Sequence, residues 1–356
     1  MSTRQRKVAS GKGEVERQLP LACADESAAV EFMERQRGWA TEADASCPKC
    51  GVVGESYKMK DAQTGERNAR YLWRCRACKT QFTVKVGTVM EDSPIPVRFW
   101  CLAFYRACAS KKGVSALQIQ RETGLTYKSA LFMMHRIRWA MAPANADDAK
   151  LGGNGEIVEF DETYIGGKPR GHARYSQPIK ADGTRKSGPG FDFADRKTRV
   201  VGGVERGGNV KVRVTQNLTS GALKKHVLDL VDTKAELHTD QLPTYKAIGS
   251  QFAGHERVRH NAGQYVRYTL EGKQVTTNRI EGFWAGVKRQ MHGTHHAVSR
   301  KHLHRYLSEA EFKYNSRRLT DGERTVKLIR ATVNRRLTYA QQVAKNRDAL
   351  GRYTDR

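Results

Sequence analysis

Two Cys-X-X-Cys pairs separated by 24 residues constrain the N-terminal part of this chain more than any other feature. The first pair is Cys47 and Cys50, and the second is Cys75 and Cys78. Each pair forms a tight turn whose two thiolates face one metal ion, and two such turns complete a tetrahedral Zn²⁺ site. Redox-active pairs are the alternative, but no thioredoxin-like strand–helix–strand pattern surrounds them. We therefore expect a structural zinc ribbon.

The net charge predicts a polyanionic partner. The 356 residues include 63 Lys and Arg against 37 Asp and Glu, which gives a formal net charge of +26 at pH 7. Because binding to phosphates releases condensed counterions, an excess of this size favours nucleic acid. The alternatives are a generally basic, soluble protein and a protein that binds RNA within a large assembly. The net charge does not indicate which reaction the protein catalyses.

Cysteine usage and hydropathy indicate the compartment. Seven cysteines is an odd number, and no apolar segment follows the basic start of the chain, which argues against a secreted, disulfide-bonded protein. No run approaches the roughly 18 apolar residues of a membrane span. We expect a cytoplasmic, nucleoid-associated protein with no membrane partner.

The pattern of apolar residues, turns and charges divides the chain into six segments. The region before Pro143 is largely helical apart from the ribbon, and strands alternate with helices after it. A Gly/Pro-rich basic stretch over 168–197 is expected to be a long loop. The expected segments are a basic disordered arm (1–20), a helix plus the zinc ribbon (21–95), a helix-turn-helix DNA-binding region (96–142), a linker (143–155), an α/β catalytic domain (156–318) and a basic tail (319–356).

Residues 113–138 have the spacing of a helix-turn-helix motif. Ser115 and Thr126 are placed to cap two helices, and Gly124 suits the turn between them. Such a second helix enters a major groove in many DNA-binding proteins. Since many helical hairpins bind nothing, a plain helix pair is the alternative. The basic residues expected to contact DNA from the second helix are Lys128, Arg136 and Arg138.

Three separated carboxylates follow the linker. Asp161 lies within a strand predicted over 156–165, on the face opposite Glu162. Asp240 ends a short predicted strand, and Glu281 borders the apolar stripe of a predicted helix. Considered one at a time, these acids also have purely structural explanations. Asp240 is placed to cap a helix, and Glu281 is placed to form a surface salt bridge with Lys288 two turns later.

Together the three acids suit a two-metal site. An acid on a central strand, one after a later strand and one on a following helix would hold two divalent cations. Hard carboxylate ligands favour Mg²⁺ or Mn²⁺. Such ions activate a water or a 3′-hydroxyl group for in-line displacement at phosphorus. The pattern therefore predicts phosphodiester chemistry on nucleic acid.

The text around the acids resembles the transposases of the IS1595 group, which have an ISXO2-like catalytic domain. The matching segments are FDETYIGGK around Asp161, ELHTDQLPTY around Asp240, and TTNRIEGFWAGVKRQMHGTHH from Thr276 onward. The resemblance covers roughly residues 20–318. It implies an RNase H-like mixed sheet flanked by helices, preceded by the zinc ribbon and the helix-turn-helix region.

The resemblance also implies a function. It identifies Asp161, Asp240 and Glu281 as a catalytic DDE triad, and Lys288, with Arg289 beside it, as DNA contacts. Asn278, one turn before Glu281, is the rival for the third position, and Glu162 is the rival for the first.

A protein of this group would bind terminal inverted repeats, cleave double-stranded DNA and transfer strands with Mg²⁺. It would act as a homo-oligomer on paired ends. A nuclease without strand transfer and a transposase-derived DNA-binding regulator are the alternatives.

Overall fold

The computed structural model describes residues 14–143, 149–166, 197–259 and 265–343, which fall into two compact units. The first unit comprises 14–142 together with 316–343, and the second comprises the residues between them. The loop expected over 168–197 lies, apart from Lys197, outside the described residues. None of the helices described is both long enough and apolar enough to cross a membrane.

The first unit combines helices with a small antiparallel sheet. Its strands pair in the order β1-β2-β3 and belong to the segment that contains the four metal-site cysteines. The elements are α1 (Glu14–Ala24), α2 (Glu26–Gln36), β1 (Ser56–Lys58), β2 (Trp73–Cys75), β3 (Gln81–Phe82), α3 (Val97–Ala109), α4 (Ala116–Thr123), α5 (Tyr127–Met141), α10 (Asp321–Arg330) and α11 (Tyr339–Val343).

Helices α4 and α5 begin and end where capping chemistry predicts. The side chain of Ser115 accepts a hydrogen bond from the amide of Gln118, and Thr126 accepts one from Ser129. Gly124 ends α4 with φ of +73°, a left-handed conformation that costs glycine little. The helix–turn–helix geometry therefore follows from local sequence.

The expected disordered arm is partly wrong, because residues 14–20 begin α1. Leu19 and Ala22 are buried, and α1 packs against α2 and α3. Pro20 lies inside this helix and several charged residues surround it, so the sequence alone shows no clean apolar stripe. Tertiary packing stabilises the helix instead. Residues 1–13 lie outside the described part of the chain.

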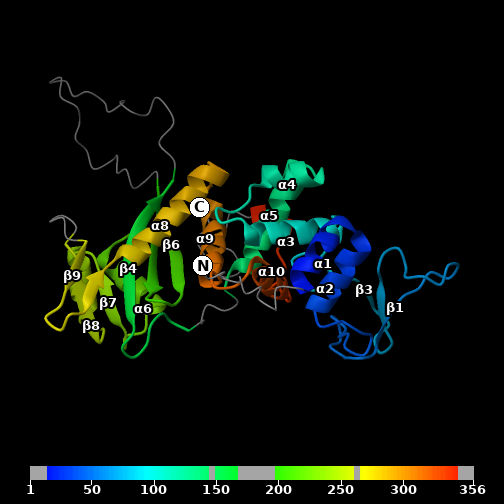
Figure 1. Cartoon of the computed structure of the whole chain (residues 1–356), viewed down its shortest axis with the longest axis horizontal. Coiled ribbons are helices and arrows are strands. Elements are labelled where there is room, and N and C mark those ends of the chain that lie inside the picture. The colour runs from blue at the N-terminus through cyan, green and yellow to red at the C-terminus, as the bar shows by residue number, and fades with distance from the viewer. Residues whose placement is uncertain (1–13, 144–148, 167–196, 260–264, 344–356) are drawn as a thin grey trace, which may run out of the picture. The chain divides into compact units, whose positions relative to one another are not determined.

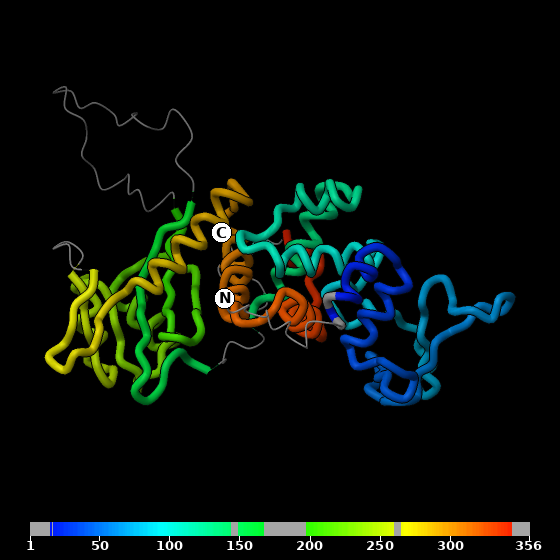
Figure 2. Tube along the Cα trace, viewed as in Figure 1, coloured from blue at the N-terminus to red at the C-terminus, as the bar shows by residue number. Residues whose placement is uncertain are grey.

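The expected basic tail also contains packed structure. A capping box formed by Thr320 and Glu323 starts α10, and Leu328 and Ile329 are buried. The helix lies against α3, so residues 316–343 return to the first unit (Figure 2). Charged residues on the outer face of α10 make this segment basic and polar on average, so its composition does not reveal the apolar face. Residues 344–356 lie outside the described structure.

The second unit is built on a five-stranded mixed sheet in the order β6-β5-β4-β7-β8. Strands β6, β5 and β4 pair antiparallel, while β4, β7 and β8 pair parallel. This sheet, flanked by helices, confirms the expected fold class. The elements are β4 (Ile157–Ile165), β5 (Thr198–Glu205), β6 (Val210–Thr215), α6 (Ser220–Leu230), β7 (Glu236–Thr239), α7 (Pro243–Gly249), β8 (Gly254–Arg257), β9 (Val266–Tyr268), β10 (Gln274–Thr276), α8 (Asn278–Gln290) and α9 (Arg300–Asn315).

Figure 1 shows helices lying against this sheet. The two faces of the sheet carry separate apolar cores. Val158 and Phe160 of β4 pack with α6 and α7 on one face. Ile165 of β4, with Val200 of β5, packs with α8 and α9 on the other. Since side chains alternate along a strand, the odd-numbered residues of β4 share the face of α8.

Part of the expected linker is packed against the second unit. Leu151 is buried in the core with α6, and its amide donates to the carbonyl of Leu230 at 2.8 Å. Gly152 has φ of +76°, and a Cβ atom there would lie 2.6 Å from Cβ of Ala235. Glycine is therefore required at this position for steric reasons, and the Gly-rich composition that suggested a linker serves close packing instead.

Candidate functional site

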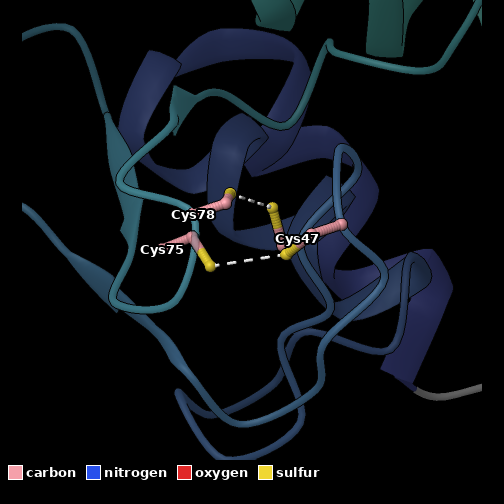
Figure 3. A group of neighbouring side chains, drawn as sticks. Cys47, Cys75 and Cys78 are labelled. Atoms are coloured by element: carbon pink, nitrogen blue, oxygen red, sulfur yellow. Dashed lines mark hydrogen bonds between the residues drawn. The ribbon is translucent and has the colours of Figure 1, made fainter.

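The four cysteines converge as a metal site (Figure 3). Their sulfur atoms all lie within 4.8 Å of one another, with 3.6 Å between those of Cys47 and Cys78 and 3.7 Å between those of Cys50 and Cys75. Zn–S bonds of about 2.3 Å in a tetrahedron require S···S distances of about 3.8 Å. In the described part of the chain no other group of three or more potential ligands converges this closely. The cluster fits Zn²⁺.

Hydrogen bonds and aromatic packing support the cysteine cluster. The hydroxyl and then the amide of Thr80 donate to Cys78 and lower the pKa of its thiol to about 6, which favours the thiolate that binds metal. Beside the cluster, Trp39, Trp73 and Phe82 form a small buried aromatic core with ring centroids 5.6–6.4 Å apart. An aromatic core of this small size is suited to a ribbon that folds around a single metal ion.

Asp161 lies on the central strand β4, on the face that packs against α8. Burial, and then the charge of Glu162, raises the pKa of Asp161 to about 7. The charges of Asp240 and Glu281 act in the same direction. Because Coulombic effects weaken with distance, Asp240 and Glu281 lie within electrostatic range of Asp161.

The elements of the fold position the other two acids. Asp240 follows β7, which pairs parallel with β4, and its Oδ1 atom accepts a 2.9 Å hydrogen bond from the amide of Leu242. Glu281 lies in the first turn of α8, where Oε1 accepts a 2.8 Å hydrogen bond from the hydroxyl of Thr277. Both carboxylates are held by short-range hydrogen bonds near strand and helix ends.

The rival residues occupy different surroundings. Glu162 points to the α7 side of the sheet, where its Oε2 accepts a 2.6 Å hydrogen bond from the hydroxyl of Tyr245. Burial raises the pKa of Glu162, and the nearby charge of Asp240 adds to this effect. Asn278 is the exposed first residue of α8. Asp161 lies on the α8 side of β4, and the charge of Glu281 on α8 acts on it.

The predicted basic contacts divide into exposed and buried groups. Lys128 on α5, and Lys288 and Arg289 on α8, are exposed. Arg136 and Arg138 are only 6% and 1% exposed, which differs from the surface position expected for a DNA contact. Buried side chains of this kind serve the fold.

Arg136 donates to main-chain carbonyl groups rather than facing solvent. Its Nη1 atom donates to Val89 and Glu91 at 3.0 and 2.9 Å, and its Nε atom donates to Leu337 at 3.1 Å. Nη2 of Arg138 lies 3.5 Å from the carbonyl of Val114. The sequence interpretation treated both as groove contacts because they are basic residues of the second helix of the motif, and it could not show which face of that helix is buried.

A buried polar network beside the acids was not foreseen. Glu159, two residues before Asp161, is fully buried with Arg206 and the first amides of α8. The signal in the sequence was a carboxylate in the middle of a β-branched strand, which is costly to bury without partners. Its partners lie in segments that sequence reasoning could not bring together.

Comparison with known proteins agrees with this arrangement. Residues 150–315 match the model of the ISXO2-like transposase domain, and residues 24–81 match the model of the transposase zinc-ribbon domain. The chain is also 28% identical over 240 residues to a Halobacterium salinarum protein described as an uncharacterized protein in transposable element ISH50. That similarity covers 67% of this chain and 76% of the relative.

Proposed function

The chain belongs to the IS1595 transposases, and from this membership we propose that it is a DDE enzyme that cleaves DNA and transfers strands at insertion-sequence ends. In this proposal Asp161, Asp240 and Glu281 are the catalytic residues. The zinc ribbon and the α4–α5 pair bind the terminal inverted repeats. The protein acts at the nucleoid, on double-stranded DNA.

The observation that carries the proposal is the electrostatic environment of Asp161. A buried carboxyl group beside three other acids, with its pKa raised to about 7, is unfavourable as an anion without a compensating cation. The three proposed ligand groups come from three different elements: a central strand, a strand end and a helix. This suits two ions about 3.5–4 Å apart.

The residues of the chain hold and orient the metal ligands. Thr277 fixes one oxygen of Glu281, and the amide of Leu242 fixes one oxygen of Asp240. When bound, Mg²⁺ or Mn²⁺ would supply activation of a water or 3′-hydroxyl group and charge stabilisation at the leaving oxygen. The ligand groups, all hard oxygen donors, fit either ion.

The exposed cations supply the DNA contacts in this proposal. Lys288 and Arg289 lie about two turns after Glu281 on α8, so they reach backbone phosphates next to the reacting group. Lys128 is exposed at the start of α5, where a recognition helix meets a groove. Two DNA ends must be joined in one complex, so we propose that a homo-oligomer is the active species.

The test is strand transfer with pre-cut transposon ends and Mg²⁺. We compare the wild type with Asp161→Asn, Asp240→Asn and Glu281→Gln, and use Glu309→Gln on α9 as a control carboxylate outside the site. Loss of activity in the three variants, with DNA binding and the control intact, supports the proposal. Survival of Glu281→Gln together with loss in Asn278→Ala would assign the third position to Asn278.

Two other outcomes separate the alternatives. Cleavage without joining would indicate a nuclease. Wild-type protein that binds DNA but nicks it with neither Mg²⁺ nor Mn²⁺ would indicate a transposase-derived DNA-binding regulator.

A further inference from the structure

We propose that Glu159 and Arg206 are positioning residues that fix the start of α8 on strand β4, so that Glu281 faces Asp161. This inference rests on the proposed function, because it assigns these two residues a role in assembling the acid triad. Neither residue is proposed to touch metal or DNA.

Glu159 caps α8 from a neighbouring strand. Its Oε2 atom accepts hydrogen bonds from the amides of Arg279 and Ile280 at 2.8 and 3.3 Å. The first amides of a helix lack intrahelical partners and are normally satisfied by the side chain of the N-cap residue. Here the N-cap residue, Thr277, makes no such hydrogen bond with its side chain. A carboxylate 120 residues earlier in the chain takes over this role.

The hydroxyl of Thr277 binds a side chain of α8. It donates to Oε1 of Glu281 at 2.8 Å, one turn further along α8. Glu159 binds the first amides of α8, and Thr277 at the start of the same helix binds Glu281. Both contacts therefore depend on where α8 begins.

Arg206 holds the segment that leads into α8. Its Nη1 atom donates to the carbonyl of Gln274 at 2.8 Å, and its Nη2 lies 3.5 Å from the carbonyl of Thr276, both on β10. Its Nε atom donates to Oε1 of Glu159 at 3.2 Å. One guanidinium group thus joins β10 to β4 immediately before the helix begins.

The spacing of residues along β4 explains how the cap by Glu159 restrains the position of Glu281 relative to Asp161. Glu159 and Asp161 lie two residues apart on the same face, about 7 Å along the strand. The amides bound by Glu159 belong to the residues directly before Glu281. Glu159 is fully buried, while the side chain of its partner Arg206 is 19% exposed. A buried carboxylate is costly to keep, and such a pair inside a fold is best understood where it fixes one register among several.

The test uses Glu159→Gln, Arg206→Gln and the double variant in the full-length protein. Amide hydrogen exchange of the peptide covering 276–284 reports the cap directly, without any need for activity. Calorimetric titration with Mn²⁺ reports the triad. We expect faster exchange at the start of α8 and a roughly 10- to 100-fold weaker Mn²⁺ affinity, the range found for residues that orient metal ligands.

Two comparisons separate positioning from stability alone. Glu309→Gln is a matched control, because Glu309 is also a fully buried glutamate of the second unit and pairs with Lys313 at 2.7 Å. It is expected to lower the melting temperature while leaving Mn²⁺ affinity unchanged. In the double variant the loss of affinity should be less than the product of the two single losses, since both residues act through the same contact.

The possible failures are distinguishable. If the wild type binds Mn²⁺ and Glu159→Gln binds it equally well, the positioning role is wrong, whatever the exchange data show. If exchange at the start of α8 is unchanged, the cap is wrong. If the wild type binds no Mn²⁺, the proposed function itself fails and the positioning role fails with it. If Glu159→Gln does not fold, Arg206→Lys is measured instead. Lysine keeps the positive charge but is too short to reach the carbonyl groups of β10, and the same criteria apply to this variant.

Discussion

The hydroxyl of Thr277 donates a 2.8 Å hydrogen bond to Oε1 of Glu281, one helical turn away. This contact occurs at the N-cap position, where a threonine ordinarily binds the amides of its own helix. A side chain well suited to helix capping therefore orients a carboxylate instead. Its effect on activity should exceed its effect on stability.

Replacing Thr277 with valine is expected to reduce strand transfer about tenfold or more while changing the free energy of unfolding by only about 1 kcal/mol. Valine keeps the shape and removes the donor. Thr277→Ser keeps the donor and should retain most activity. Strand-transfer rates and chemical denaturation measure the two quantities. A valine variant with wild-type rates would show that the hydrogen bond does not matter for Glu281.

Stability without divalent metal should fall as pH rises from about 4 to about 7. The pKa of Asp161 is raised from its ordinary value of 3.8 to about 7, chiefly by burial and then by Glu162. The folded state therefore holds this proton more tightly than the unfolded state, and its stabilising contribution is complete below pH 4 and lost above pH 7. Thermal melts of wild type and Asp161→Asn should converge at pH 4, with the variant more stable at pH 8.

Divalent metal should reverse this difference at high pH. Mg²⁺ is expected to raise the melting temperature of the wild type at pH 8 and to have little effect at pH 5, because protonated Asp161 competes with metal. The Asp161→Asn variant should respond weakly at both values. Equal stabilisation of wild type and variant by Mg²⁺ would contradict the assignment of Asp161 as a ligand.

Purified protein should contain about one zinc ion per chain. Changing Cys47 and Cys75 together to Ser should abolish zinc binding and unfold the ribbon. Trp39 and Trp73 pack within this unit and would then become exposed to water. Elemental analysis and a red shift of tryptophan emission measure the two effects. Cys108→Ser, outside the cluster, is the control and should retain the metal. Zinc retained by the double variant would show that the cluster is not the binding site.

Arg136 and Lys288 should behave oppositely on substitution. Arg136→Ala is expected to cost on the order of 3 kcal/mol of stability, because it leaves three buried carbonyl groups without their donor. Lys288→Ala should change stability by less than about 0.5 kcal/mol. It should reduce the slope of log affinity against log salt by about 0.9 if Lys288 contacts one phosphate. If the Arg136→Ala variant were as stable as the wild type and bound DNA more weakly, the result would support Arg136 as a DNA contact.

Local signals in the sequence predicted much of the fold and part of the site. The two cysteine pairs predicted the sulfur cluster, and alternation along β4 placed Asp161 opposite Glu162. The caps at Ser115 and Thr126 predicted the ends of their helices. Each of these inferences depends on residues within a few positions of one another or on a regular period.

Long-range partners account for what the sequence did not reveal. Arg136 was expected at a DNA surface because it is a basic residue of a predicted recognition helix, and its acceptor Leu337, 201 residues away, could not be foreseen. Glu159 had no assigned role because the amides it caps are 120 residues away. Leu151 was placed in a linker because Ala235, which its glycine neighbour approaches, is distant in the chain. Buried polar side chains of this kind show their purpose only when the chain is folded.

The return of α10 to α3 has a consequence for biosynthesis. The first unit is interrupted after residue 142 and lacks α10 until residue 330 has been made, about 190 residues later. At translation rates of roughly 5–20 residues per second, the apolar face of α3 waits about 10–40 s for its partner on the ribosome. The second unit, which is continuous from 143 to 315, has all its strands by then. The second unit is therefore able to fold before the first unit is complete.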